Sequence, residues 1–139
     1  MQTKKFQFPK YLIHKIRQCW LWSEVRRQAL KAAYVSPGKV RCRHCQLVKK
    51  THKKILVQVK KRIKRKIQTV TITKRKSLVH VDHIIPFAPE HGFRSLKDLG
   101  PALDRMFDLK NHQILCEKCH SKKTNEENLR RRKLNTGQV

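Results

Sequence analysis

Apolar residues recur at a helical spacing through residues 10–33. They occupy positions 12, 13, 16, 20, 21, 25, 29 and 30, which lie on one stripe of a helix. The sequence SPG at 36–38 then interrupts the pattern, so the predicted helix ends there. We expect its two tryptophans, Trp20 and Trp22, to pack in the core rather than to stack on bases.

The pattern changes to alternation in residues 55–81. β-Branched residues alternate there with basic or polar ones, which predicts two or three strands: Val57, Val59, Val70 and Ile72. Neither Gly nor Pro occurs between residues 39 and 85, so the predicted hairpin turn is placed only within residues 60–66. Disorder of this basic segment is the alternative, but its valines and isoleucines favour strand pairing.

The rest of the chain predicts a loop, a helix, a short strand and a closing helix. Residues 86–101 contain the breakers of a loop, with a helical turn at SLKDL. ALDRMF predicts a helix and HQILC a short strand that leads into the closing helix, after which residues 135–139 should fray.

Composition changes this picture by adding an extreme positive charge. The 139 residues include 35 Lys and Arg against 9 Asp and Glu, a formal net charge of +26. Residues 49–76 alone carry 13 Lys and Arg, and no acidic residue lies between Glu24 and Asp82. Charge this concentrated is typical of a nucleic-acid-binding protein.

Membrane association is not indicated by the sequence. No stretch approaches the roughly 20 apolar residues that span a bilayer, and no signal-peptide pattern is present. We expect a soluble, intracellular, cytoplasmic protein.

The five cysteines divide into two C-x-x-C pairs and one remaining thiol. Cys42 and Cys45 form the first pair, and Cys116 and Cys119 the second. In a reducing compartment this pattern predicts a structural Zn²⁺ site, which the fold must assemble from both ends of the chain. Two separate redox motifs, or coincidence, are the alternatives. Cys19 is interpreted as a small buried hydrophobic residue.

VDHIIP places Asp82 and His83 side by side at the end of an apolar run. The pair is explained either as the end of a strand and the start of a turn, or as chemistry. His120 directly follows Cys119, so its imidazole should point away from the zinc. With Asp82 it would form a two-ligand site for a hard divalent ion. His83, with an ordinary pKa near 6.5, would be neutral often enough to take a proton from water.

VDHIIP and NHQILCEKCHSKKT together resemble the HNH nucleases of the ββα-metal fold. The order of Asp-His, Asn and C-x-x-C-H carries the resemblance, which covers roughly residues 40–125. The basic helix before the first C-x-x-C and the long loop before Asn111 also resemble small bacteriophage HNH endonucleases. The implied fold class is α+β, with a ββα-metal core, two zinc knuckles, an N-terminal basic helix and a basic β-hairpin insertion.

The resemblance implies a metal-dependent endonuclease that hydrolyses DNA. His83 matches the general base and Asn111 the residue that steadies it, while Asp82 and His120 match the ligands of a catalytic Mg²⁺ or Mn²⁺. The four paired cysteines match the zinc site of many members. Double-stranded DNA is the implied partner, with phage packaging proteins as further candidates, and the sequence leaves monomer or dimer open.

A single domain of 1–139 is expected, with three parts and one insertion. They are an extension at 1–39, a core at 40–125 with its insertion at 49–79, and a basic tail at 126–139. Candidate nucleic-acid contacts lie near the site and at the predicted turn: Lys122, Lys123, Lys60, Lys61, Arg62, Lys64, Arg65 and Lys66.

Three departures from the family pattern leave alternatives open. His80 stands where many relatives carry an acidic or neutral residue; an extra metal contact and a phosphate contact are the alternatives, and we interpret it as a plain strand residue. His112 replaces the usual apolar residue after Asn111, and residues 49–79 are unusually long and basic. The alternatives are a non-catalytic zinc protein that organises nucleic acid, and an HNH nuclease that acts on RNA or only with a partner complex.

Overall fold

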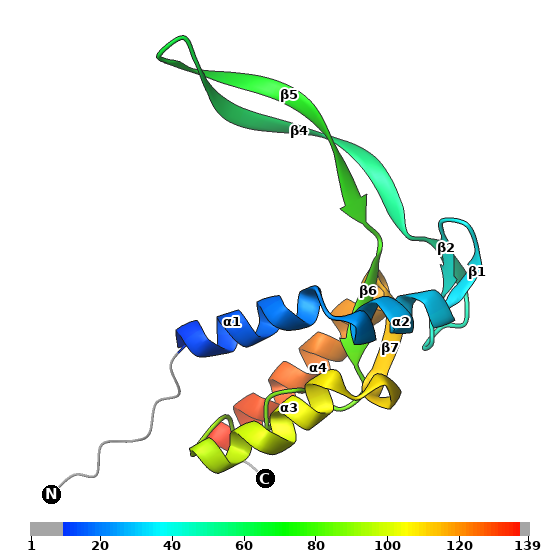
Figure 1. Ribbon diagram of the computed structural model, residues 1–139, viewed down its shortest axis with the longest axis vertical. Coiled ribbons are helices and arrows are strands. Elements are labelled where there is room, and N and C mark those ends of the chain that lie inside the picture. Colours follow the sequence, from blue (N-terminus) through cyan, green and yellow to red (C-terminus); the bar gives the residue numbers. More distant parts are fainter. Residues whose placement is uncertain (1–9, 137–139) are drawn as a thin grey trace, which may run out of the picture.

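The computed structural model describes residues 10–136, in which helices surround small antiparallel sheets (Figure 1). The α-helices are α1 (Lys10–Leu21), α2 (Glu24–Ala32), α3 (Leu99–Phe107) and α4 (Glu117–Thr136). Short 3₁₀ turns are η1 (Leu96–Asp98) and η2 (Leu109–Asn111). The strands are β1 (Tyr34–Ser36), β2 (Lys39–Arg41), β3 (Val48–Lys50), β4 (His52–Ile63), β5 (Lys66–Ser77), β6 (Val79–His83) and β7 (His112–Cys116).

The N-terminal segment forms two helices, so the prediction of one continuous helix over 10–33 is wrong. Ser23 separates α1 from α2: its hydroxyl donates to the carbonyl of Trp20 at 2.7 Å and accepts from the amide of Arg26 at 3.3 Å. Serine caps a new helix here because its side chain replaces a missing backbone partner. Trp20 packs against the core, whereas Trp22 is 83% exposed, and Cys19 is exposed rather than buried.

The strands of the basic segment are confirmed, and so is the location of the turn. β4 and β5 pair without interruption from His52 opposite Ser77 to Ile63 opposite Lys66. Lys64 and Arg65 form the turn between them. This hairpin projects away from the helices (Figure 1).

β6 and β7 form the sheet around which the core is built. Buried and half-buried residues alternate along β6, as expected for a strand with two different faces. Val79 and Val81 pack with Ile114 of β7 and with α2 residues. On the opposite face His80 meets α4 through the ring of His120. The sheet therefore lies between the N-terminal helices and α4.

The remaining elements hold the loop between β6 and β7. Phe87, Ala102 and Met106 form a second buried cluster, against which Ile13, Ile16 and Trp20 of α1 pack. The predicted helical turn, the helix at ALDRMF and the strand at HQILC all occur. α4 continues to Thr136, so most of the predicted tail is helical; residues 137–139 of the predicted frayed end lie outside the described part.

Within residues 10–136, no helix combines the length and the apolar character that crossing a membrane requires.

Candidate functional site

Four cysteine thiols meet although 70 residues separate the two pairs. The sulfur atoms of Cys42, Cys45, Cys116 and Cys119 all lie within 4.8 Å of one another. Tetrahedral Zn²⁺ with Zn–S bonds of about 2.3 Å places its sulfurs just under 4 Å apart, and Cys45 Sγ lies 4.0 Å from Cys116 Sγ. The four cysteines thus form a possible zinc site of the closed, structural type.

The two knuckles are positioned by different elements. Cys116 ends β7 and Cys119 lies in the first turn of α4, while the first knuckle follows β2. The amide of Arg43 donates to the carbonyl of Ile114 at 2.8 Å, which fastens that knuckle to β7.

The thiols differ in how readily they ionise. Burial raises the pKa of Cys42, but backbone amides of Cys45, Cys116 and His44 outweigh it and lower the pKa to about 6. Desolvation and hydrogen bonds with the other thiols raise the pKa of Cys119 to about 12. Amides that favour the thiolate at Cys42 suit a metal ligand.

His83 is buried at the end of β6, where its tautomer is set by a backbone carbonyl. Its Nε2 lies 3.1 Å from the carbonyl oxygen of Met106. Since a carbonyl only accepts, Nε2 carries the hydrogen, and a neutral His83 has its lone pair on Nδ1. Burial lowers the pKa of His83, partly opposed by the bond to Met106. This is an imidazole held neutral, as a general base requires.

A tryptophan and a second histidine pack against His83. Its ring centroid lies 4.7 Å from that of Trp20 and 4.7 Å from that of His112. His112 Nδ1 donates to the carbonyl of Asp108 at 2.7 Å, and His112 Nε2 accepts from Trp20 Nε1 at 2.8 Å. Both ring nitrogens of neutral His112 are therefore satisfied, and α1 is tied to the strand opposite His83.

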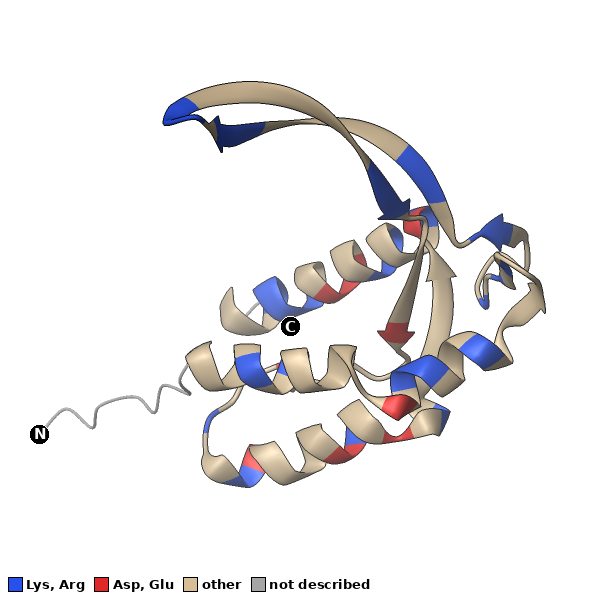
Figure 2. Ribbon diagram, turned by 45° about the horizontal axis from the view of Figure 1, so that its top comes forward, with Lys and Arg blue, Asp and Glu red and all other residues tan. Residues whose placement is uncertain are grey.

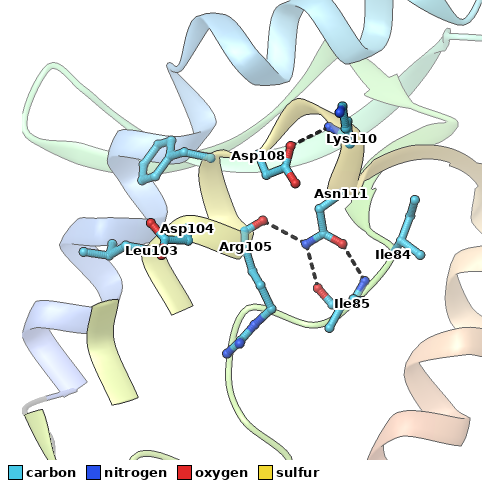
Figure 3. Close-up of a pocket in the computed structure, with 9 residues that line it drawn as sticks. Ile84, Ile85, Leu103, Asp104, Arg105, Asp108, Lys110 and Asn111 are labelled. Carbon is cyan, nitrogen blue, oxygen red and sulfur yellow. Dashed lines mark hydrogen bonds between the residues drawn. The ribbon is translucent and has the colours of Figure 1, made fainter. Parts of the chain in front are cut away.

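Asn111 holds the loop that follows His83 (Figure 3). Its Oδ1 accepts from the amide of Ile85 at 2.8 Å, and its Nδ2 donates to the carbonyls of Ile85 and Arg105 at 2.9 Å and 2.8 Å. The hollow of about 790 Å³ drawn in Figure 3 is lined by Asn111 but not by Asp82, His83 or His120. Asn111 therefore links the backbone at Ile85, just after β6, to the backbone at Arg105 in α3.

A cavity of about 490 Å³ brings the other predicted residues together. Asp82, His83 and His120 all line it, together with Lys123 and Glu127 of α4. His120 also stacks on His80, with centroids 4.3 Å apart and planes at 12°. Burial, and then the neighbouring His120, lower the pKa of His80. His80 is a residue of strand β6, as interpreted, and its ring packs against that of His120.

Lys123 places a cation among the oxygen atoms of this cavity. Its Nζ lies 2.8 Å from Asp82 Oδ2, donates to the carbonyl of His83 at 2.8 Å and also contacts Glu127. Burial lowers its pKa, but the two carboxylates outweigh burial and raise it. Three oxygen acceptors thus surround this one ammonium group. Among the described residues, however, only the four cysteines form a cluster of three or more metal-ligand side chains.

The other predicted contacts are spread over two regions. Lys122 is exposed on α4 and lines a hollow together with Cys119 of the four-cysteine cluster. The hairpin residues Lys60, Lys61, Arg62, Lys64, Arg65 and Lys66 are all exposed near or in the turn. They belong to a separate surface, because none of them lines the cavity at Asp82.

Sequence reasoning missed the roles of Trp20, His112 and Glu127. Glu127 had a detectable signal, since it lies seven residues after His120 and therefore on the same helix face. No local pattern connects Trp20 to His112, which is 92 residues away.

Comparison of the chain with protein-family models, with curated proteins and with solved structures found no significant match.

Proposed function

We propose that this protein is a zinc-stabilised, metal-dependent HNH endonuclease that hydrolyses phosphodiester bonds of DNA. The observation that supports the proposal is the shared cavity, which Asp82, the buried His83 and His120 of the first turn of α4 all line. β6 and α4 contribute residues to this cavity and β7 pairs with β6, so the chain order β6, β7, α4 is the one expected of a ββα unit. The sequence resemblance to HNH nucleases, which assigns the roles of these residues, is the other support.

The mechanism follows from the roles of these side chains. His83, protonated at Nε2 toward Met106, takes a proton from water through Nδ1. The water oxygen bonds to phosphorus while the bond from phosphorus to the 3′ oxygen breaks, which leaves a 5′ phosphate and, after protonation, a 3′ hydroxyl. A divalent ion held by Asp82 and His120 would stabilise the phosphate charge and the departing oxygen. Asn111 keeps the loop after His83 in place through its hydrogen bonds.

The test is a plasmid-nicking assay with Mg²⁺, Mn²⁺ or chelator, run beside a gel-shift measurement of binding. His83→Ala should bind DNA like the wild type and lose at least about 100-fold in cleavage, the usual contribution of a general base. His14→Ala, at an exposed histidine of α1, is the matched control and should cut normally. Equal cleavage by wild type and His83→Ala would overturn the proposed mechanism.

A non-catalytic nucleic-acid-binding protein is the second candidate. The contact of Lys123 with Asp82 favours it, because an ammonium group already neutralises the carboxylate that would bind the ion. This candidate predicts tight binding without metal-dependent cleavage of any DNA or RNA tested.

A further inference from the structure

A hollow of about 590 Å³ lies at the base of the β4–β5 hairpin, and its lining is strongly basic. Six of the residues that line it carry positive charge and none is acidic: Lys39, Lys50, Lys53, Lys54, Lys74 and Arg75. We refer to it as the basal hollow. It is separate from the cavity at Asp82, with which it shares no residue.

The positive charge of the basal hollow is not neutralised by the protein. None of its six cations forms a salt bridge with another described residue, and Lys76, just outside it, pairs with Glu117. His52, which also lines the hollow, has a buried Nδ1 without a hydrogen-bond partner in the described part of the chain. Like charges around one hollow repel each other, so an anion bound there would relieve the repulsion.

The turn of the hairpin carries a second concentration of charge at a conformational cost. Lys64 and Arg65 both have positive φ, 46° and 65°. Asn-Gly favours such turns, whereas residues with long side chains pay roughly 1–2 kcal/mol each for this conformation. Six of the seven residues 60–66 are Lys or Arg. Lys64 and Arg65 therefore occupy positions at which Asn or Gly would make the turn more stable. Residues that reduce local stability in this way often serve a function.

The dimensions and composition of the hairpin favour duplex DNA as the partner. Strands of 12 residues extend roughly 40 Å, slightly more than one turn of B-form DNA, about 34–36 Å. A two-stranded ribbon fits the major groove of B-DNA but does not fit the deep, narrow major groove of duplex RNA. Residues 49–77 contain no Phe, Tyr or Trp on which unpaired bases would stack. Figure 2 shows the hairpin extending from the body, with Lys and Arg at its tip and base.

We propose that the β4–β5 hairpin is a DNA-binding arm that lies along the major groove and holds phosphates at two places, the basal hollow and the Lys64–Arg65 turn. This inference rests on the proposed function, in which duplex DNA is the partner. It requires no cleavage, because the arm and the cavity at Asp82 are different surfaces. The arm supplies most of the binding affinity, and the cavity supplies the chemistry.

The arm is tested by fluorescence anisotropy with a labelled DNA duplex in chelator, over a range of salt concentrations. The basal variant replaces Lys53, Lys54, Lys74 and Arg75 by Gln. It should weaken binding at least about tenfold and reduce the salt slope by roughly 0.9 for each DNA phosphate that the variant no longer neutralises.

The turn variant separates binding from folding. Lys64→Asn with Arg65→Gly introduces the preferred turn sequence, so the hairpin should become more stable while DNA affinity falls and the salt slope decreases by up to about 2. The matched control, Arg132→Gln with Lys133→Gln, removes the same charge from exposed positions near the end of α4. Binding by this control should remain close to that of the wild type.

Each result decides for or against the arm. Wild-type affinity in both hairpin variants overturns the proposal, as does an equally large decrease in affinity in the α4 control, which would mean that only total charge matters. If unlabelled duplex RNA or single-stranded DNA displaces the labelled DNA duplex as well as unlabelled duplex DNA does, the arm does not lie in the major groove. If the wild type binds through the arm but never cleaves, the arm is supported and the proposed nuclease function fails.

Discussion

The ammonium group of Lys123 lies 2.8 Å from the carboxylate of Asp82. It also contacts Glu127, so one cation bridges two acidic side chains at the edge of the candidate site. A divalent ion bound by Asp82 must therefore compete with Lys123. The direct phosphate contact predicted for Lys123 stays a prediction, and in this structure its ammonium group is engaged by these two carboxylates.

Removing the charge of Lys123 should strengthen divalent-ion binding. Lys123→Gln frees the Asp82 carboxylate, and we expect Mn²⁺ affinity to rise several-fold, as measured by calorimetry or electron paramagnetic resonance. Lys122→Gln, at the adjacent exposed position, should leave it unchanged. If Lys123→Gln instead lowers DNA affinity with no effect on Mn²⁺, Lys123 is a phosphate contact.

Zinc should be required for the fold. The four-cysteine site ties the segment after β2 to β7 and α4, and metal binding in such sites contributes directly to folding free energy. We expect one zinc per chain by elemental analysis, and loss of cooperative thermal unfolding in Cys116→Ser or after chelation. Cys19→Ser, at the exposed thiol, should keep both zinc and stability; full zinc content in Cys116→Ser would contradict the site.

Trp20 should support the position of His83 through His112. Trp20→Phe removes the hydrogen-bond donor that lies 2.8 Å from Nε2 of the buried His112. The nitrogen is then left without a partner, which should lower the free energy of unfolding by about 1–3 kcal/mol. We expect slower nicking at saturating DNA with unchanged binding. Trp22→Phe is the control, since Trp22 is 83% exposed. Equal stability and rates in the two variants would remove Trp20 from this role.

How much of the structure was predictable depends on the range of the interactions. The alternation of Val57, Val59, Val70 and Ile72 predicted strands, because successive side chains of a strand point to opposite faces whatever the rest of the chain does. The C-x-x-C spacing predicted the cysteine cluster because metal chemistry restricts which side chains must meet.

The failures concern contacts that local patterns do not contain. The apolar stripe of residues 10–33 continues through the break at Ser23, and only the capping bonds of its hydroxyl reveal two helices. Cys19 lies beside Trp20 in sequence but on an exposed part of α1. The bond from Trp20 to His112 exists because α1 folds across the loop after β6, a tertiary arrangement with no spacing rule.

The low pKa of His83 should determine the acidic limb of cleavage. Burial lowers this pKa from its ordinary value of 6.5, so the neutral imidazole, which can accept a proton, is still the major form when the pH falls to 6.5. The rate of single-turnover nicking at saturating Mn²⁺ should therefore fall with decreasing pH as His83 becomes protonated, with the midpoint of this acidic limb below pH 6.5. Folding stability should also decrease toward low pH. The stabilising contribution of His83 is fully present above pH 6.5 and is lost as the pH falls through the pKa of His83 in the folded protein. Gel shifts over the same range control for weaker binding. An acidic limb centred above pH 6.5, with binding unchanged, would mean that a group other than His83 accepts the proton.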